Sequence, residues 1–201
     1  MNIGRIGVWT ANRFLGDDNL APAAELAESL GYGALWLGYS PRLPELRPAL
    51  AATERITVAT GIANVWEYDP SELAAEHAEL SLEFPGRIRT GTGIGHPELK
   101  IAYTKPVTAM RNFLGLTSAP TPIPRNEMCI AALGPKLLDL AAERTLGAHT
   151  YFVPPEHTAF ARRQLERRAA PRARGRVRGR RGSRSGQGYR PRLRQELSQP
   201  R

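Results

Sequence analysis

Three short segments rich in small residues could bring the backbone close to a flat or phosphorylated ligand. They are Thr60–Asn64 (TGIAN), Thr90–His96 (TGTGIGH) and Ala132–Lys136 (ALGPK). Glycine lets a ring or a phosphate chain approach the main chain closely, and the free N–H groups at the start of a helix, as at Pro135, can bind an anion. Each segment alone is more often an ordinary turn, and the second lacks the G-x-G-x-x-G spacing of a dinucleotide site. Together they favour a planar, phosphorylated ligand.

Few other side chains have a spacing that indicates chemistry. His96 follows the glycines and could reach a ligand there, or it could be a solvated loop histidine. Trp9 and Trp66 could form the walls of a ring-binding cleft or could simply pack. The 4 histidines have no partner at metal-ligand spacing and Cys129 is the 1 cysteine, so we expect no metal site. No G-x-S-x-G motif supports serine hydrolase chemistry.

The elements that position these segments alternate between strands and helices. Amphipathic helical patterns follow β-rich runs, and the strands are predicted at residues 4–10, 34–39, 56–61, 88–93, 128–133 and 149–153. Helices are predicted at about 19–30, 43–53, 70–83, 102–114, 135–146 and 155–168. This alternation indicates an α/β fold with a parallel sheet. Six βα units without a dinucleotide motif favour an incomplete (β/α) barrel of the TIM type, about six of eight units, with all three segments on its C-terminal face.

The charge of the chain changes at about residue 166. The net charge is +9, yet the last forty residues contain 15 of the 28 basic side chains and two of the 19 acidic ones. Residues 167–201 have too few apolar side chains to form a core, so we expect a domain over 1–166 and a disordered Arg-rich tail over 167–201. The tail could arise from a shifted reading frame, could be a natural basic extension, or could bind nucleic acid non-specifically through phosphates.

The chain shows no sign of a membrane or secretory segment. No apolar run approaches the roughly 20 residues that span a bilayer, and the first residues do not form a secretory signal. The lone cysteine fits a reducing compartment. We therefore expect a cytoplasmic protein with no membrane contact.

Longer stretches of the chain resemble one known family. SLGYGALWLG, ERITVATGIANVWEYDP, PGRIRTGTGIGHPE and AALGPKLLDLAAERTLGAHTYFVPPEHT are similar to the bacterial luciferase-like monooxygenase superfamily, most of all to its actinobacterial branch that uses the deazaflavin coenzyme F-420. The resemblance covers about residues 3–166. It implies a TIM-type barrel with coenzyme F-420, or FMN as the alternative, at the C-terminal ends of its strands. It also implies hydride transfer to or from a small organic substrate.

The resemblance further implies the residues of the site. A non-proline cis peptide that supports the cofactor ring in relatives matches Gly61–Ile62, and His96 falls where relatives place a side chain near the redox-active ring, which makes it the catalytic candidate. The glycine-rich exit of the fourth strand and a phosphate-side turn also match. With Gly61 and Ile62, the implied cofactor-binding residues are Ala63, Gly93, Gly95, Leu133, Gly134 and Pro135.

The chain departs from the family after the sixth unit. Family barrels have a seventh and an eighth strand that close against the first, and the composition beyond residue 168 predicts neither. Strands one and six would then present open edges, through which the protein could form a homo-oligomer. Besides an active oxidoreductase, the sequence therefore leaves open an inactive truncated member and a protein that binds nucleic acid through its tail. It does not identify the substrate.

Overall fold

The computed structural model describes residues 3–95, 105–116 and 122–169. They belong to the compact unit Met1–Pro171, which is separate from Arg172–Arg201. The centre of this unit is a parallel sheet in which the strands follow the order β1-β2-β3-β5-β6-β7, and β4 pairs with β5 beside this path. The strands are β1 (Gly7–Thr10), β2 (Ala34–Leu37), β3 (Thr57–Thr60), β4 (Ala63–Asn64), β5 (Ile88–Gly93), β6 (Met128–Ala131) and β7 (Gly147–His149).

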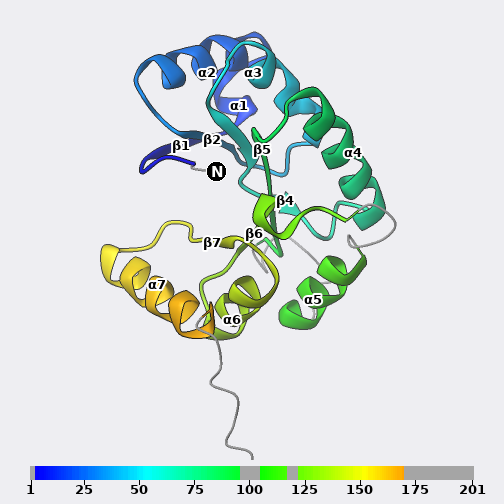
Figure 1. Cartoon of the computed structure of the whole chain (residues 1–201), viewed down its shortest axis with the longest axis vertical. Helices are drawn as coiled ribbons and strands as arrows, with labels where there is room; N and C mark the ends of the chain where they lie inside the picture. Colours follow the sequence, from blue (N-terminus) through cyan, green and yellow to red (C-terminus); the bar gives the residue numbers. More distant parts are fainter. Residues whose placement is uncertain (1–2, 96–104, 117–121, 170–201) are drawn as a thin grey trace, which may run out of the picture. The chain divides into compact units, whose positions relative to one another are not determined.

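Helices cover the outer side of this curved row of strands (Figure 1). Leu35, Val58, Ile88 and Ile130 occupy one face of the sheet and pack into a single apolar core with residues of the helices. The sheet with its helices is the α/β half-barrel that the sequence predicts. The α-helices are α1 (Asn12–Leu15), α2 (Leu20–Ser29), α3 (Arg47–Ala51), α4 (Pro70–Glu83), α5 (Pro106–Leu116), α6 (Pro135–Arg144) and α7 (Pro155–Ala169), and the 3-10 turns are η1 (Asp17–Asn19), η2 (Leu43–Leu46) and η4 (Arg125–Glu127).

The other face of the sheet carries mostly small side chains. Residues paired across parallel strands point to the same side, and Trp9 pairs with Trp36, Trp36 with Ala59, and Ala59 with Arg89. Because alternate residues of a strand share a face, this inner row also contains other members. They are Gly91, Gly93, Cys129, Ala131, Gly147 and His149. The inner wall is therefore lined by glycine, alanine and cysteine over much of its length.

The predicted strand order is confirmed, and the strand ends need correction. The first strand begins at Gly7 rather than at residue 4, and the short β4 was not predicted. The sixth predicted strand, 149–153, is wrong by two residues at its start, because β7 spans Gly147–His149. The helix predicted over 135–146 ends two residues earlier, since α6 ends at Arg144, and Gly147 pairs with Cys129 as part of the sheet.

Two predicted helices also differ in detail. The helix predicted over 19–30 begins one residue later, at Leu20, and the amide Nδ2 of Asn19 donates to Leu15 O (2.6 Å). Leu30, the last residue of that predicted helix, lies beyond the end of α2 and is 66% exposed. The predicted helix over 43–53 is divided into η2 and α3, because Pro44 and Pro48 each begin a new helical segment.

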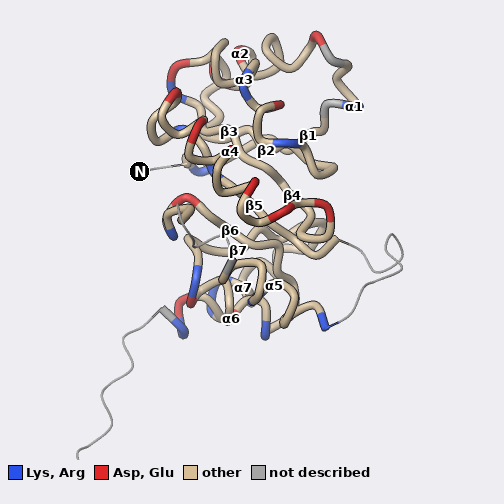
Figure 2. Tube along the Cα trace, turned by 90° about the vertical axis from the view of Figure 1, so that its right-hand side faces the viewer, with Lys and Arg blue, Asp and Glu red and all other residues tan. Residues whose placement is uncertain are grey.

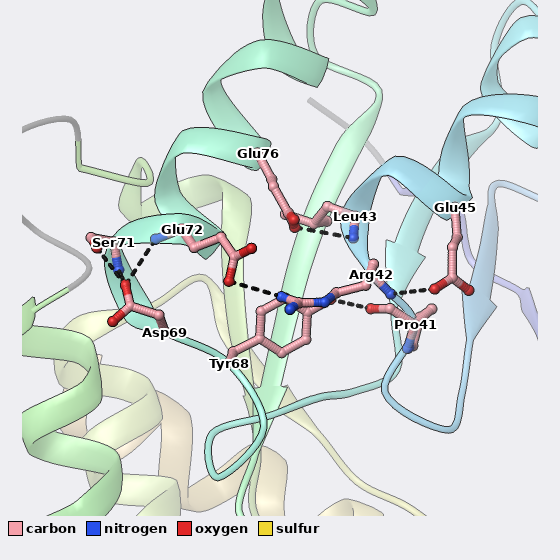
Figure 3. Close-up of polar contacts among 9 residues, drawn as sticks. All are labelled: Pro41, Arg42, Leu43, Glu45, Tyr68, Asp69, Ser71, Glu72 and Glu76. Atoms are coloured by element: carbon pink, nitrogen blue, oxygen red, sulfur yellow. Dashed lines mark hydrogen bonds and ion pairs between the residues drawn. The ribbon is translucent and has the colours of Figure 1, made fainter.

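A polar cluster joins η2 to the start of α4 (Figure 3). The Tyr68 hydroxyl donates to Pro41 O, and the Arg42 guanidinium lies 4.6 Å from the centroid of the Tyr68 ring. Arg42 Nη1 also donates to Glu72 Oε2 (3.1 Å). Asp69 caps α4, because its side chain accepts hydrogen bonds from the Ser71 and Glu72 N–H groups. The cluster fixes the segment that connects β4 to α4, directly after the candidate site.

Residues of both charges are spread along the described trace (Figure 2). Helix α7, predicted over 155–168, continues to Ala169, three residues beyond the predicted domain boundary at 166. The predicted tail properties and its nucleic-acid binding concern residues that lie outside the described ranges. None of the described helices is long and apolar enough to cross a membrane.

Candidate functional site

The residues that directly follow β3 and β5, here called the exits of these strands, lie next to each other at the C-terminal side of the sheet. The Gly61–Ile62 peptide after β3 is cis, at the position that the resemblance implies. The chain then forms β4, in which Ala63 pairs with Thr92 and Asn64 with Gly93. Val65 N donates to Gly93 O (2.9 Å) and continues this pairing. The two exits therefore run side by side for several residues.

Close packing explains why glycine occupies the β5 exit. A Cβ atom on Gly93 would lie 2.7 Å from Ile62 Cγ1 and 3.0 Å from Ala131 Cβ, so any larger residue would displace Ile62. Gly95 has a φ of +64°, a left-handed conformation that favours glycine. The candidates Gly61, Ile62, Ala63, Gly93 and Gly95 thus lie together, as predicted, whereas His96 lies outside the described residues.

The third small-residue segment follows β6 and leads into α6. Ala132 N donates to His149 O (3.2 Å), which places this segment beside the exit of β7. Leu133 O lies 3.0 Å from His157 Nε2. Gly134 is the N-cap of α6, and a Cβ atom added there would have no atom within 4 Å. The start of α6 is therefore open on the side where the sequence predicts a phosphate.

Two tryptophans hold the exits in place. Trp9 Nε1 donates to Gly61 O (2.7 Å), and Trp66 Nε1 donates to Ile94 O (2.9 Å). Both indoles were candidates for the walls of a ring-binding cleft. The structure places one at each of the two adjoining exits, with its N–H satisfied by the backbone.

Sequence reasoning missed His149, the last residue of β7. It lies at the same C-terminal edge of the sheet as these exits, and this edge is called the rim below. Its ring lies 5.0 Å from the Trp36 ring in an edge-on arrangement, and its Nε2 borders Gly61. Its Nδ1 is buried and, among the described residues, has no hydrogen-bond partner. Burial lowers the pKa of His149, so the ring is neutral at pH 7. The misplaced strand had put this residue at the N-terminal end of its strand, where no ligand is expected.

An aromatic chain, also not predicted, crosses the rim from the β1 exit to the β7 exit. Phe14 contacts Tyr39, Tyr39 contacts Trp9, Trp9 contacts Tyr151, and Tyr151 contacts Phe152, with ring centroids 5.4–6.1 Å apart. Tyr39 and Phe152 have φ angles of +63° and +53°. Such conformations cost on the order of 1–3 kcal/mol for a residue other than glycine, and they concentrate at binding sites.

The remaining titratable groups near the sheet have structural surroundings. His77 of α4 is buried on the outer face and contacts Thr90 Oγ1 (2.8 Å) and Glu127 Oε2 (3.0 Å). Burial raises the pKa of Cys129 to about 12, so the thiol stays protonated. Within the described ranges, no group of three His, Cys, Asp or Glu side chains could hold a metal ion.

Comparisons with known proteins show what this chain is similar to. Residues 16–111, which include the β3 and β5 exits, match the family described as luciferase-like monooxygenase. This part of the chain, slightly less than half of it, is similar to that family. A 104-residue stretch is 29% identical to the F420-dependent glucose-6-phosphate dehydrogenase of Microbacterium testaceum, over 45% of this chain and 31% of the relative.

Solved structures show the same fold at lower identity. The coenzyme F420 dependent tetrahydromethanopterin reductase of Methanopyrus kandleri has a TM-score of 0.67 at 18% identity, over 82% of this chain and 60% of the reductase. The oxygenating constituent of 3,6-diketocamphane monooxygenase from Pseudomonas putida, in complex with FMN, has a TM-score of 0.62 at 16% identity, over 84% and 61%. The chain thus spans about a third of this curated relative and three fifths of these structural neighbours.

Proposed function

We propose that this luciferase-like protein binds coenzyme F-420, with FMN as the alternative, and is an oxidoreductase that transfers hydride between the cofactor and a small organic substrate. The observation that carries the proposal is the junction of the β3 and β5 exits, where Ile62 packs on Gly93. Two features support the fit of a planar, phosphorylated group at this rim. They are the unpartnered buried Nδ1 of His149 and the open side of Gly134.

Each part of the rim has a distinct role in this proposal. Gly61, Ile62, Ala63, Gly93 and Gly95 would form the surface against which the ring lies. Leu133, Gly134 and Pro135 would receive the phosphate at the start of α6, where backbone N–H groups and the helix dipole favour an anion. His96 stays the predicted catalytic residue. The bound cofactor would supply the hydride chemistry, while the protein supplies position and electrostatics.

The relatives favour the deazaflavin over FMN. Both the 29% identical dehydrogenase and the Methanopyrus reductase are named as dependent on coenzyme F-420. The FMN complex of the diketocamphane monooxygenase supports FMN as the alternative. These relatives are longer than this chain, so we do not assign their substrates to it.

Fluorescence titration of the full chain with coenzyme F-420, and separately with FMN, tests the proposal. We expect saturable binding of coenzyme F-420 with a dissociation constant lower than that of FMN. The matched variants are Gly134→Ala and Gly115→Ala, since an added Cβ has open space at both positions. Gly134→Ala should weaken coenzyme F-420 binding severalfold because its methyl group enters the phosphate position, whereas Gly115→Ala on α5 should not change it. Failure of both cofactors to bind the folded chain would contradict the proposal.

A further inference from the structure

Helix α7 lies beside α6 and is connected to it by polar side chains (Figure 1). Gln164 Nε2 and Arg168 Nη2 donate to the two carboxylate oxygens of Asp139, each at 2.7 Å. Ala161, also on α7, is buried in the apolar core. These contacts hold α7 in a fixed position against α6. A side chain at the start of α7 can therefore support the turn that precedes α6.

His157, in the first turn of α7, contacts that turn. Its Nε2 lies 3.0 Å from Leu133 O, and because a carbonyl oxygen only accepts, Nε2 carries the proton and donates it. Nδ1 of the same ring is buried and, among the described residues, has no hydrogen-bond partner. The ring also contacts Phe160, with centroids 5.8 Å apart. Within the described ranges, the imidazole therefore has a single hydrogen bond, and it is made to the turn before α6.

This hydrogen bond fixes the direction of the next backbone N–H group. The Leu133–Gly134 peptide is trans, so its C=O and its N–H point in opposite directions. Because Leu133 O faces His157 on α7, the Gly134 N–H points away from α7. Gly134 has a φ of −84°, but glycine adopts positive φ about as readily. Without the His157 bond this peptide could turn over and reverse the N–H.

We propose that His157 is a positioning residue for the phosphate of the cofactor. Its hydrogen bond to Leu133 O holds the Gly134 N–H in the direction that binds the phosphate. This inference rests on the proposed function, which places the phosphate at the start of α6, and it adds a residue that does not touch the ligand. The turn cannot fix its own N–H groups, since Pro135 has no N–H and Gly134 has no side chain to cap α6.

Phosphate binding and the His157 bond should strengthen each other. Hydrogen bonds in a chain polarise one another, so an anion on the Gly134 N–H makes Leu133 O a better acceptor for the His157 Nε2–H. The His157 bond should therefore raise the affinity for a ligand that carries a phosphate and leave the affinity for the same ring without a phosphate unchanged. A residue that only stabilises the fold would affect both ligands alike.

Fluorescence titrations of the full chain test this difference with coenzyme F-420 and its phosphate-free core, the deazaflavin that ends at the ribityl hydroxyl. His157→Ala should weaken coenzyme F-420 binding about threefold to tenfold, the range that one hydrogen bond provides, and leave binding of the core unchanged. His157→Gln, whose side-chain amide can donate to the same carbonyl, should recover part of the loss. Phe160→Leu is the matched control, because it removes the ring contact and keeps the hydrogen bond. It should bind both ligands as the wild-type chain does.

A measurement on the wild-type chain decides the case in which His157→Ala does not fold, as circular dichroism would show. In NMR spectra, inorganic phosphate should shift the amide resonance of Gly134. It should also move the His157 Nε2–H resonance downfield, because the hydrogen bond to Leu133 O becomes stronger. A shift of Gly134 without a shift of His157 would contradict the coupling.

Other results would overturn the inference. They are equal weakening of both ligands in His157→Ala, no weakening of either, or the same loss in Phe160→Leu. The experiments also separate the two proposals. Coenzyme F-420 binding that His157→Ala does not change removes only this inference. If the wild-type chain binds neither coenzyme F-420 nor FMN, while phosphate still shifts Gly134 and His157 together, only the proposed function fails.

Discussion

Two histidines, the buried His77 and the half-buried His149, show how one residue type takes different roles in this fold. Both ring nitrogens of His77 have partners, Thr90 and Glu127, on neighbouring elements. His149, by contrast, has an unpartnered Nδ1 among the described residues. Since buried polar groups are normally satisfied, the first histidine is explained by packing and the second indicates a ligand.

The His77 network should make stability depend on pH. Burial lowers the pKa of His77 below its ordinary value of 6.5, and this outweighs the opposite effect of Glu127. The unfolded chain therefore binds more protons, so the free energy of unfolding is highest above pH 6.5 and falls as the pH decreases below it. Denaturant unfolding at pH 7 and pH 5 should show this fall, and His77→Gln should reduce it. The variant should keep part of the pH dependence of its free energy of unfolding, because the pKa of His149 is also lowered. An unchanged slope in His77→Gln would contradict the assignment.

At the scale of elements, one carboxylate connects α2 to the turn before β3. Glu28 accepts hydrogen bonds from the backbone N–H groups of Glu54, Arg55 and Ile56, at 2.6–3.2 Å. These bonds fix the entry of β3, whose exit carries Gly61. Although burial alone would raise the pKa of Glu28, the three backbone hydrogen bonds outweigh it and lower the pKa.

Replacing the Glu28 carboxylate should destabilise the start of β3. Glu28→Gln should lower the free energy of unfolding at pH 7 by about 1 kcal/mol, near the low end for charged hydrogen bonds because water screens the site. The stability contributed by Glu28 should be present above its ordinary pKa of 4.5 and be lost as the pH falls below it. Glu25→Gln on the same helix is the control and should leave stability unchanged. Equal effects of the two substitutions in thermal unfolding would exclude this role.

Some elements could be predicted because their signals are local. Asp69 and Pro70 begin α4 through contacts with the next three residues, so its start was predicted correctly. The position of β7 depends instead on pairing with β6, and three residues such as Gly147–His149 have no β pattern of their own. The left-handed conformation of Tyr39 and Phe152 is not indicated by any local sequence pattern, since neither residue is a glycine. The missed part of the rim, including His149, follows from these non-local causes.

At the scale of the whole molecule, β1 and β7 are the two ends of the sheet among the described residues. An unpaired strand edge with apolar neighbours promotes association, and Ile6 beside β1 is 66% exposed. We propose that the full chain self-associates through these edges. Light scattering during gel filtration should show an apparent mass that rises with concentration. Ile6→Lys should reduce the association, and Leu82→Lys, at an 85% exposed position on α4, should not. A monomer at every concentration would contradict this proposal.

Hydrogen–deuterium exchange of the full chain, with and without saturating coenzyme F-420, tests the cofactor site most directly. The proposal predicts slower exchange in three segments of the C-terminal rim, residues 61–66, 91–95 and 132–137. Residues 28–33 and 53–56, at the opposite ends of the strands, should exchange at the same rate in both samples. Slower exchange in the second set alone, or no change in the first set at saturation, would contradict a cofactor site at the exits of β3, β5 and β6.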